Sequence, residues 1–86
     1  MTTWIEDPKL VKTKTDFMNL IAYLCRDLAQ HQDNWENITL ADFLSAMHGF
    51  TGDLEGYYKN RGETVDLSRP SWSVFAAILL AARVYE

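Results

Sequence analysis

Two histidines, one cysteine and the carboxylates are the residue types in this sequence that could do chemistry. His31 stands beside an amide and a carboxylate at the end of a predicted helix, and His48 precedes Asp53 by five residues. Helical zinc sites use two histidines spaced i, i+4, and carboxylate-bridged metal sites in helical bundles use Glu-x-x-His. Neither spacing occurs, so we expect no metal, no cofactor and no catalytic residue. Both histidines are expected to be solvated or to cap helix ends.

The cysteine and the glycines do not indicate an enzyme either. Cys25 lies four residues after Ile21 on the apolar side of a predicted helix, which indicates a small buried hydrophobic residue. A single cysteine excludes an intramolecular disulfide and a cysteine-based zinc site within one chain. The four glycines match no phosphate-binding loop. We therefore expect a protein that is not an enzyme.

The aromatic residues are the better candidates for a binding role. Trp35 lies in the polar segment D-N-W-E-N, where no helical pattern explains it. It either folds back as a lid on the core, the favoured alternative, or stands exposed as an anchor for a partner. Tyr57 and Tyr58 are adjacent on a predicted helix, so they point about 100° apart and one of them should present its hydroxyl at the surface.

The net charge of −4 is unevenly distributed. Between Asp27 and Tyr58 there are six acids and no Lys or Arg. An ordinary solvated surface is the favoured explanation, and a face for a basic partner is the functional alternative. Nucleic-acid binding is not expected, because it needs clustered basic residues. The predicted partner-binding residues are Trp35, Glu36, Asp53, Glu55 and Tyr58.

Three amphipathic or apolar segments predict an all-α fold. The helices are expected at about 16–31, 40–60 and 72–85, after an irregular lead-in over 1–14, with Thr15, Thr39 and Ser71 as N-caps. No polar residue occurs from Val74 to Ala82, so the C-terminal helix should be largely buried. The pattern predicts a compact three-helix arrangement in a single domain, residues 1–86.

Two of these helices carry more specific expectations. In the first, Leu20, Ile21 and Leu24 belong to the apolar stripe, and Asp27 lies on the opposite, polar side. In the second, the apolar stripe keeps its phase through the glycines, which indicates one long helix that either bends near 49–52 or allows another helix to approach closely. Gly62 should end that helix as part of its C-cap.

No membrane association is expected. The longest apolar run has nine residues, Val74 to Ala82, whereas a membrane-spanning helix needs about 20. The N-terminal residues have no apolar stretch typical of a signal peptide. The expected location is the cytoplasm.

Three segments together resemble a family of short, uncharacterised bacterial proteins that is classed as a domain of unknown function. They are W-E-N-x-T-L-x-x-F-L (35–44), G-Y-Y-x-N (56–60) and P-S-W-x-x-F-A-x-x-L-x-A-A-x-x-Y-E (70–86). The resemblance spans roughly residues 15–86 and implies a stand-alone bacterial helical protein. It brings no activity, cofactor or site residue with it.

The first functional hypothesis is a protein-interaction module, inhibitory or immunity-like by analogy with other small acidic proteins. The alternative is a self-associating structural protein, a homodimer for instance. A small-ligand-binding protein or an enzyme ranks third. The first two hypotheses differ in whether the partner is another protein or a second copy of the chain.

Overall fold

The computed structural model describes residues 7–86, and every regular element in that range is helical. The predicted all-α class is therefore confirmed. The radius of gyration of the Cα atoms is 12.7 Å, close to the roughly 12 Å expected for a compact chain of this length. The expected count of three helices is wrong, because residues 7–86 form four α-helices and two short 3₁₀ helices.

The N-terminal part of the fold differs from the prediction at two places. A 3₁₀ turn, η2 (Pro8–Leu10), occupies the expected irregular lead-in, whose first six residues lie outside the described range. Helix α1 (Lys14–Gln30) begins after Thr13, not after Thr15. With Thr13 as N-cap, Asp16 occupies N3 and its carboxylate accepts the Thr13 N–H, while the Thr13 hydroxyl accepts the Asp16 N–H. This reciprocal capping box fixes the start of the helix.

The predicted helix over 40–60 is divided in two. Thr39 caps α2 (Leu40–Gly52) as expected, and its hydroxyl accepts the Asp42 N–H at 3.1 Å. The helix then breaks at Asp53, whose N–H donates to the Phe50 carbonyl, before α3 (Leu54–Asn60) begins. A glycine at the last position of α2 weakens the helix there by about 1 kcal/mol relative to alanine, which favours a break at this place.

The end of α3 agrees with its sequence. Gly62 has a φ of +71°, and its N–H donates to the Lys59 carbonyl while the Glu63 N–H donates to the Tyr58 carbonyl. These two bonds form a Schellman motif, in which glycine is favoured because it adopts positive φ without strain.

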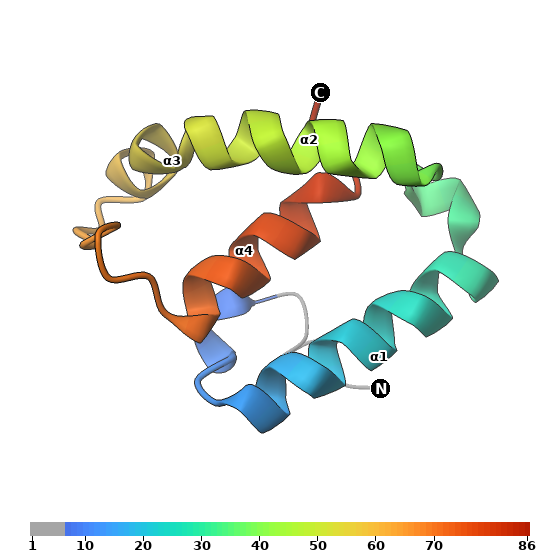
Figure 1. Ribbon diagram of the computed structural model, residues 1–86, viewed down its shortest axis with the longest axis horizontal. Helices are drawn as coiled ribbons and strands as arrows, with labels where there is room; N and C mark the ends of the chain where they lie inside the picture. Colours follow the sequence, from blue (N-terminus) through green and yellow to red (C-terminus); the bar gives the residue numbers. More distant parts are fainter. Residues whose placement is uncertain (1–6) are drawn as a thin grey trace.

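The C-terminal helix α4 (Trp72–Ala82) crosses the molecule diagonally between α1 and the α2–α3 pair (Figure 1). One core cluster joins its Ala76 and Leu80 to α1, and a second joins its Val74, Ala77 and Ile78 to α2 and α3. These two contacts explain why α4 is apolar on most sides. The expectation of a largely buried helix holds only in part, because Trp72 and Phe75 remain exposed.

Helix α4 ends at Ala82, earlier than predicted, because the chain after α1 binds its last carbonyl groups. The backbone N–H groups of Glu36 and Asn37 donate to the Arg83 carbonyl at 2.8 and 3.0 Å. The Asn37 amide donates to the carbonyls of Ala82 and Tyr85, both at 2.9 Å. These bonds satisfy carbonyl groups that a helix end leaves unpaired.

Candidate functional site

An apolar groove of about 430 Å³ lies between α1 and the beginning of α2. Leu24 and Leu28 of α1, Phe43 of α2 and Leu79 of α4 line it, together with residues of the segment that joins α1 to α2. None of its lining residues is charged. Concave apolar surfaces of this kind are typical of binding sites for apolar groups.

Large side chains beside the groove extend this surface. Leu40 is 73% exposed, Met18 is 58% exposed and Leu44 is 52% exposed. The spacing of four residues places Leu44 one turn after Leu40, and Met18 lies one turn before Ile21 on α1. We define the apolar face by six residues on α1, on α2 and just before α2: Met18, Ile21, Cys25, Ile38, Leu40 and Leu44, all of them exposed.

The apolar face exists because α1 has more apolar circumference than the core covers. Leu20 and Leu24 are buried against α4, whereas Ile21, placed on the same stripe by its spacing, is exposed. Cys25 is exposed as well, so the prediction that it is buried is wrong. A helix normally covers such a stripe against a neighbouring element, and the described residues leave this part of it uncovered.

Trp35 forms part of the wall of the groove and is itself buried. Its ring stacks on Phe43 with 5.8 Å between centroids, and its indole N–H donates to Asp27 Oδ2 at 2.8 Å. The alternative that folds Trp35 back as a lid on the core is therefore the one that the structure shows. As a partner-binding residue it could offer a partner only the small part of its ring that reaches the groove.

Asp27 lies at the centre of a buried polar cluster that the sequence did not predict. We expected it on the polar side of α1, yet it is only 9% exposed. Its Oδ2 atom accepts the Trp35 indole N–H and lies 3.3 Å from Arg83 Nη1. Burial is tolerated because the carboxylate is both hydrogen-bonded and paired with a cation. This cluster joins α1, the segment after it and the end of α4.

Tyr58 belongs to a different part of the molecule. It is buried in the second core cluster, and its neighbour Tyr57 is the more exposed of the pair. Burial raises the pKa of the Tyr58 hydroxyl above its ordinary value. The hydroxyl that the sequence placed at the surface therefore fits Tyr57 better than Tyr58.

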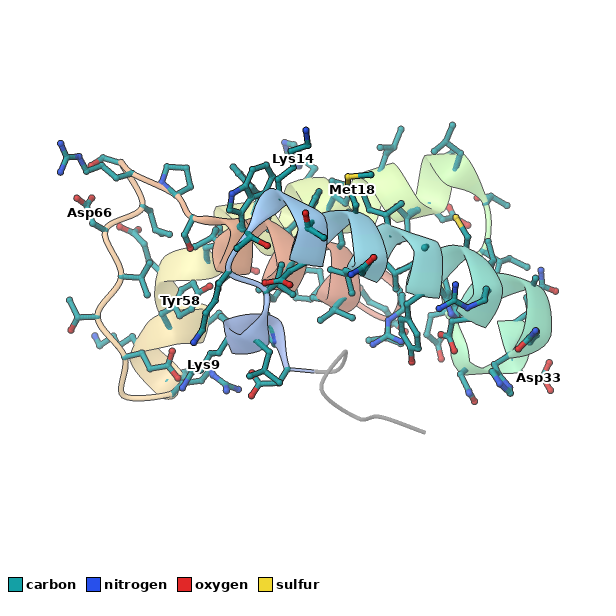
Figure 2. All side chains as sticks on the ribbon, turned by 90° about the horizontal axis from the view of Figure 1, so that it is seen from below. Lys9, Lys14, Met18, Asp33, Tyr58 and Asp66 are labelled. Atoms are coloured by element: carbon teal, nitrogen blue, oxygen red, sulfur yellow. The ribbon has the colours of Figure 1, made fainter. Side chains whose placement is uncertain are left out.

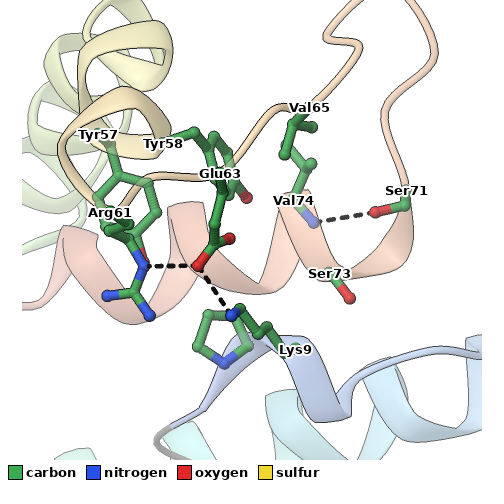
Figure 3. Close-up of a pocket in the computed structure, with 10 residues that line it drawn as sticks. Lys9, Tyr57, Tyr58, Arg61, Glu63, Val65, Ser71, Ser73 and Val74 are labelled. Carbon is green, nitrogen blue, oxygen red and sulfur yellow. Dashed lines mark hydrogen bonds and ion pairs between the residues drawn. The ribbon is translucent and has the colours of Figure 1, made fainter.

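A small pocket of about 140 Å³ lies beside Tyr58, between η2, α3 and the start of α4 (Figure 3). Lys9 Nζ is 2.8 Å from Glu63 Oε2, and Arg61 Nε is 3.4 Å from the same oxygen. The hydrogen bond from Lys9 holds the pKa of the Glu63 carboxyl below its ordinary value. The two cations therefore both pair with the Glu63 carboxylate at this pocket.

The predicted acidic residues lie outside the apolar groove. Glu36, Asp53 and Glu55 are exposed, and the last two line a shallow depression with Tyr85. The Tyr85 hydroxyl donates to the Asp53 carboxylate, and this hydrogen bond raises the pKa of the Tyr85 hydroxyl. The structure therefore brings Asp53 and Glu55 together but separates them from Trp35.

Both histidines are exposed, His31 at the end of α1 and His48 on α2. Within residues 7–86, no three side chains of His, Cys, Asp or Glu are grouped so that they could hold a metal ion. In the same range, no helix has the length and apolar character needed to cross a membrane.

Sequence reasoning missed the apolar face as a site. Ile38 and Phe43 fit the pattern of a hydrophobic staple around the Thr39 cap, and both line the groove. A signal was present in α1, where exposed apolar residues continue beyond the stripe that faces the core, at Met18, Ala22 and Ala29.

Comparison with known proteins gives a family for the chain but no activity. No curated protein and no solved structure matches the chain. The model of a family of unknown function, DUF7660, matches residues 13–86. The three segments of the family resemblance all lie within that range. The chain therefore belongs to DUF7660, a family of unknown function.

Proposed function

We propose that this protein is a non-catalytic protein-interaction module that binds a protein surface through the apolar face. The observation that carries this proposal is the uncharged groove between α1 and α2, with Leu40, which is 73% exposed, at its edge. The largest apolar patch on a typical monomeric protein measures about 300–600 Å² and is often functional; the apolar face is a patch of this kind.

The groove favours an apolar protein segment over a small polar substrate. Its polar lining residues are few, and Asn37 already uses its amide to bind the end of α4. Tight recognition of a polar ligand would need several convergent polar groups. A row of Leu, Ile or Met side chains on a partner would instead gain about 25 cal/mol for each Å² of apolar surface buried.

The exposed acids could serve a second contact. Glu36, Asp53 and Glu55 do not line the groove, so a basic partner of the kind suggested by the sequence would bind them through a contact separate from the groove. The proposal does not depend on that contact.

Site-specific photo-crosslinking in the native host tests the proposal. A benzophenone amino acid replaces Leu40 in one variant and the exposed Thr64, in the loop after α3, in the control. We expect protein adducts from position 40 that position 64 does not give, and their loss when Leu44→Asp is added. Equal adduct patterns at positions 40 and 64, or no adduct at position 40, would refute the proposal.

A further inference from the structure

We infer that the partner of the apolar face is a second copy of this chain, packed so that the two α1 helices run antiparallel across a two-fold axis. This inference rests on the proposed function, because it names the occupant of the same face. The available area, the order of side chains along α1 and the distribution of charge at its ends all support it.

The area of the apolar face fits a dimer interface. Five of its six side chains are between 43% and 73% exposed, which corresponds to on the order of several hundred Å² of apolar surface. A standard interface buries about 800 Å² on each partner, of which about 60% is apolar, or roughly 500 Å². The face therefore supplies the apolar part of one side of an ordinary interface.

The outer surface of α1 has the spacing of a helix-pairing seam. Met18, Ala22, Cys25 and Ala29 follow one another at intervals of four, three and four residues, and all four are exposed. These intervals are those of the a and d positions of a heptad repeat, which keep one stripe facing a partner helix. Ile21 and Leu28 flank the seam on the groove side, and Arg26 lies on its other side.

The order of residues along the seam is self-complementary only in the antiparallel orientation. In a two-fold antiparallel pair centred between Ala22 and Cys25, Met18 of one copy lies level with Ala29 of the other. The largest side chain of the seam then faces one of the smallest, and this happens twice because the interface is symmetric. A parallel pair would place Met18 against Met18 and leave a gap between the two Ala29 residues.

Charge at the two ends of α1 favours the same orientation. Lys12 and Lys14 lie at its N-terminal end beside one acid, Asp16, and Asp33 and Glu36 follow its C-terminal end. Figure 2 shows Lys14 and Asp33 at opposite ends of this helix, with Met18 on the side turned away from Lys9. Antiparallel packing brings the basic end of each copy to the acidic end of the other, whereas parallel packing opposes like charges.

Sedimentation of the purified full chain is the first part of the test. We expect a mass of twice 9.9 kDa at micromolar concentrations. Ala22→Glu should raise the dissociation constant by about 100-fold or more, since it places two bulky carboxylates close together at the two-fold axis and must take both out of water. A glutamate at 22 lies four residues before Arg26, which supports the helix of the monomer. Thr64→Glu, at an exposed position in the loop after α3, is the control and should stay dimeric.

Cysteine cross-linking tests the orientation. In a Cys25→Ala background, Met18→Cys and Ala29→Cys are made as separate variants and oxidised alone and as a mixture. A disulfide forms only between cysteines whose Cα atoms lie within about 7 Å of each other. The antiparallel arrangement brings position 18 of one copy level with position 29 of the other, so the mixture should form the disulfide between these two positions. Efficient cross-linking of Met18→Cys with itself would overturn the antiparallel arrangement.

A chain that remains at 9.9 kDa at several hundred micromolar would overturn the inference. If that monomer still gave photo-adducts from position 40 with other proteins, the proposed function would stand and the partner would be a different protein. Absence of both adducts and dimer would refute the two proposals together.

Discussion

Substitution of Asp27 gives the sharpest test of how the fold is held together. Its carboxylate is buried, accepts the Trp35 indole N–H at 2.8 Å and lies 3.3 Å from the Arg83 guanidinium. Asp27→Asn keeps an acceptor for the indole but removes the charge that pairs with Arg83. Asp27→Leu removes both functions, so the buried indole N–H loses its acceptor and the Arg83 guanidinium loses its carboxylate, although Arg83 Nε still donates to the Leu80 carbonyl.

The expected losses follow from those contacts. An unpaired buried donor costs about 1–3 kcal/mol, and breaking a buried ion pair costs up to about 3–5 kcal/mol. The Arg83 side chain is 16% exposed, so breaking its ion pair with Asp27 should cost a free energy near the lower end of that range. We expect Asp27→Asn to lower the free energy of unfolding by about 1–2 kcal/mol and Asp27→Leu by about 3 kcal/mol.

Urea unfolding followed by circular dichroism measures both losses. For a slope of about 1.5 kcal/mol per molar urea, a loss of 3 kcal/mol moves the midpoint by about 2 M. A double-mutant cycle with Trp35→Phe should show coupling of about 1 kcal/mol or more to Asp27→Leu. Asp33→Asn, an exposed acid close by in the sequence, should stay within about 0.5 kcal/mol of the parent protein. If Asp27→Leu behaves like Asp33→Asn, the buried cluster does not stabilise the fold and the reasoning fails.

Four further predictions concern single positions. Tyr58→Ala should lower the free energy of unfolding by about 3–5 kcal/mol in urea, because the ring lies in the core; a loss below 1 kcal/mol would instead indicate a solvent-exposed ring. Gly62→Ala should lower the free energy of unfolding by about 1 kcal/mol, because Gly62 has a φ of +71°; Gly56→Ala, at a helical position with negative φ, should not cause this loss. Hydrogen bonds from the backbone of Lys12, and also of Thr13, lower the pKa of Asp16, so its carboxylate stabilises the fold above pH 4 and this contribution is lost as the pH falls. The thermal midpoints of Asp16→Asn and the parent protein should therefore converge between about pH 5 and pH 2, and a constant difference would contradict the role of the charge. Leu40→Asp should change the stability of the monomer by less than about 0.5 kcal/mol, which dilute urea unfolding can check, because its side chain is 73% exposed.

The helical regions and several of the helix ends were predictable because short-range signals determine them. Thr39 and Ser71 cap their helices as expected, and Gly62 ends α3 with positive φ. The start of α1 was misplaced because both Thr13 and Thr15 are acceptable caps, and only the position of Asp16 at N3 decides between them. A bend near 49–52 was one of the two alternatives that the sequence left open, but a full break of the helix at Asp53 was not expected, because the apolar stripe continues in phase across it.

Long-range contacts account for the residues that sequence reasoning misplaced. Asp27 reads as a solvent-facing acid on a helix, and its partner Arg83 lies 56 positions further along the chain. Trp35 belongs to no helical pattern in the sequence, so a buried ring and an exposed ring were both compatible with it. Its contacts with Asp27 and Phe43 show that the ring is buried. The segment W-E-N is thus explained by structure, since its members bind α1, α2 and the end of α4.

The sequence of α1 carried a signal for extra apolar surface but not for where that surface lies, because periodicity gives the width of an apolar stripe but not the part of it that neighbouring helices cover. In α1, the turn from Leu20 to Leu24 meets α4, and the residues one step around the helix, Ile21 and Cys25, do not. A chain under no pressure to bind would gain solubility from polar residues at those positions. Ala22 and Cys25 are neither polar nor buried in the core, and small side chains of this kind are what the proposed dimer requires at the centre of its interface.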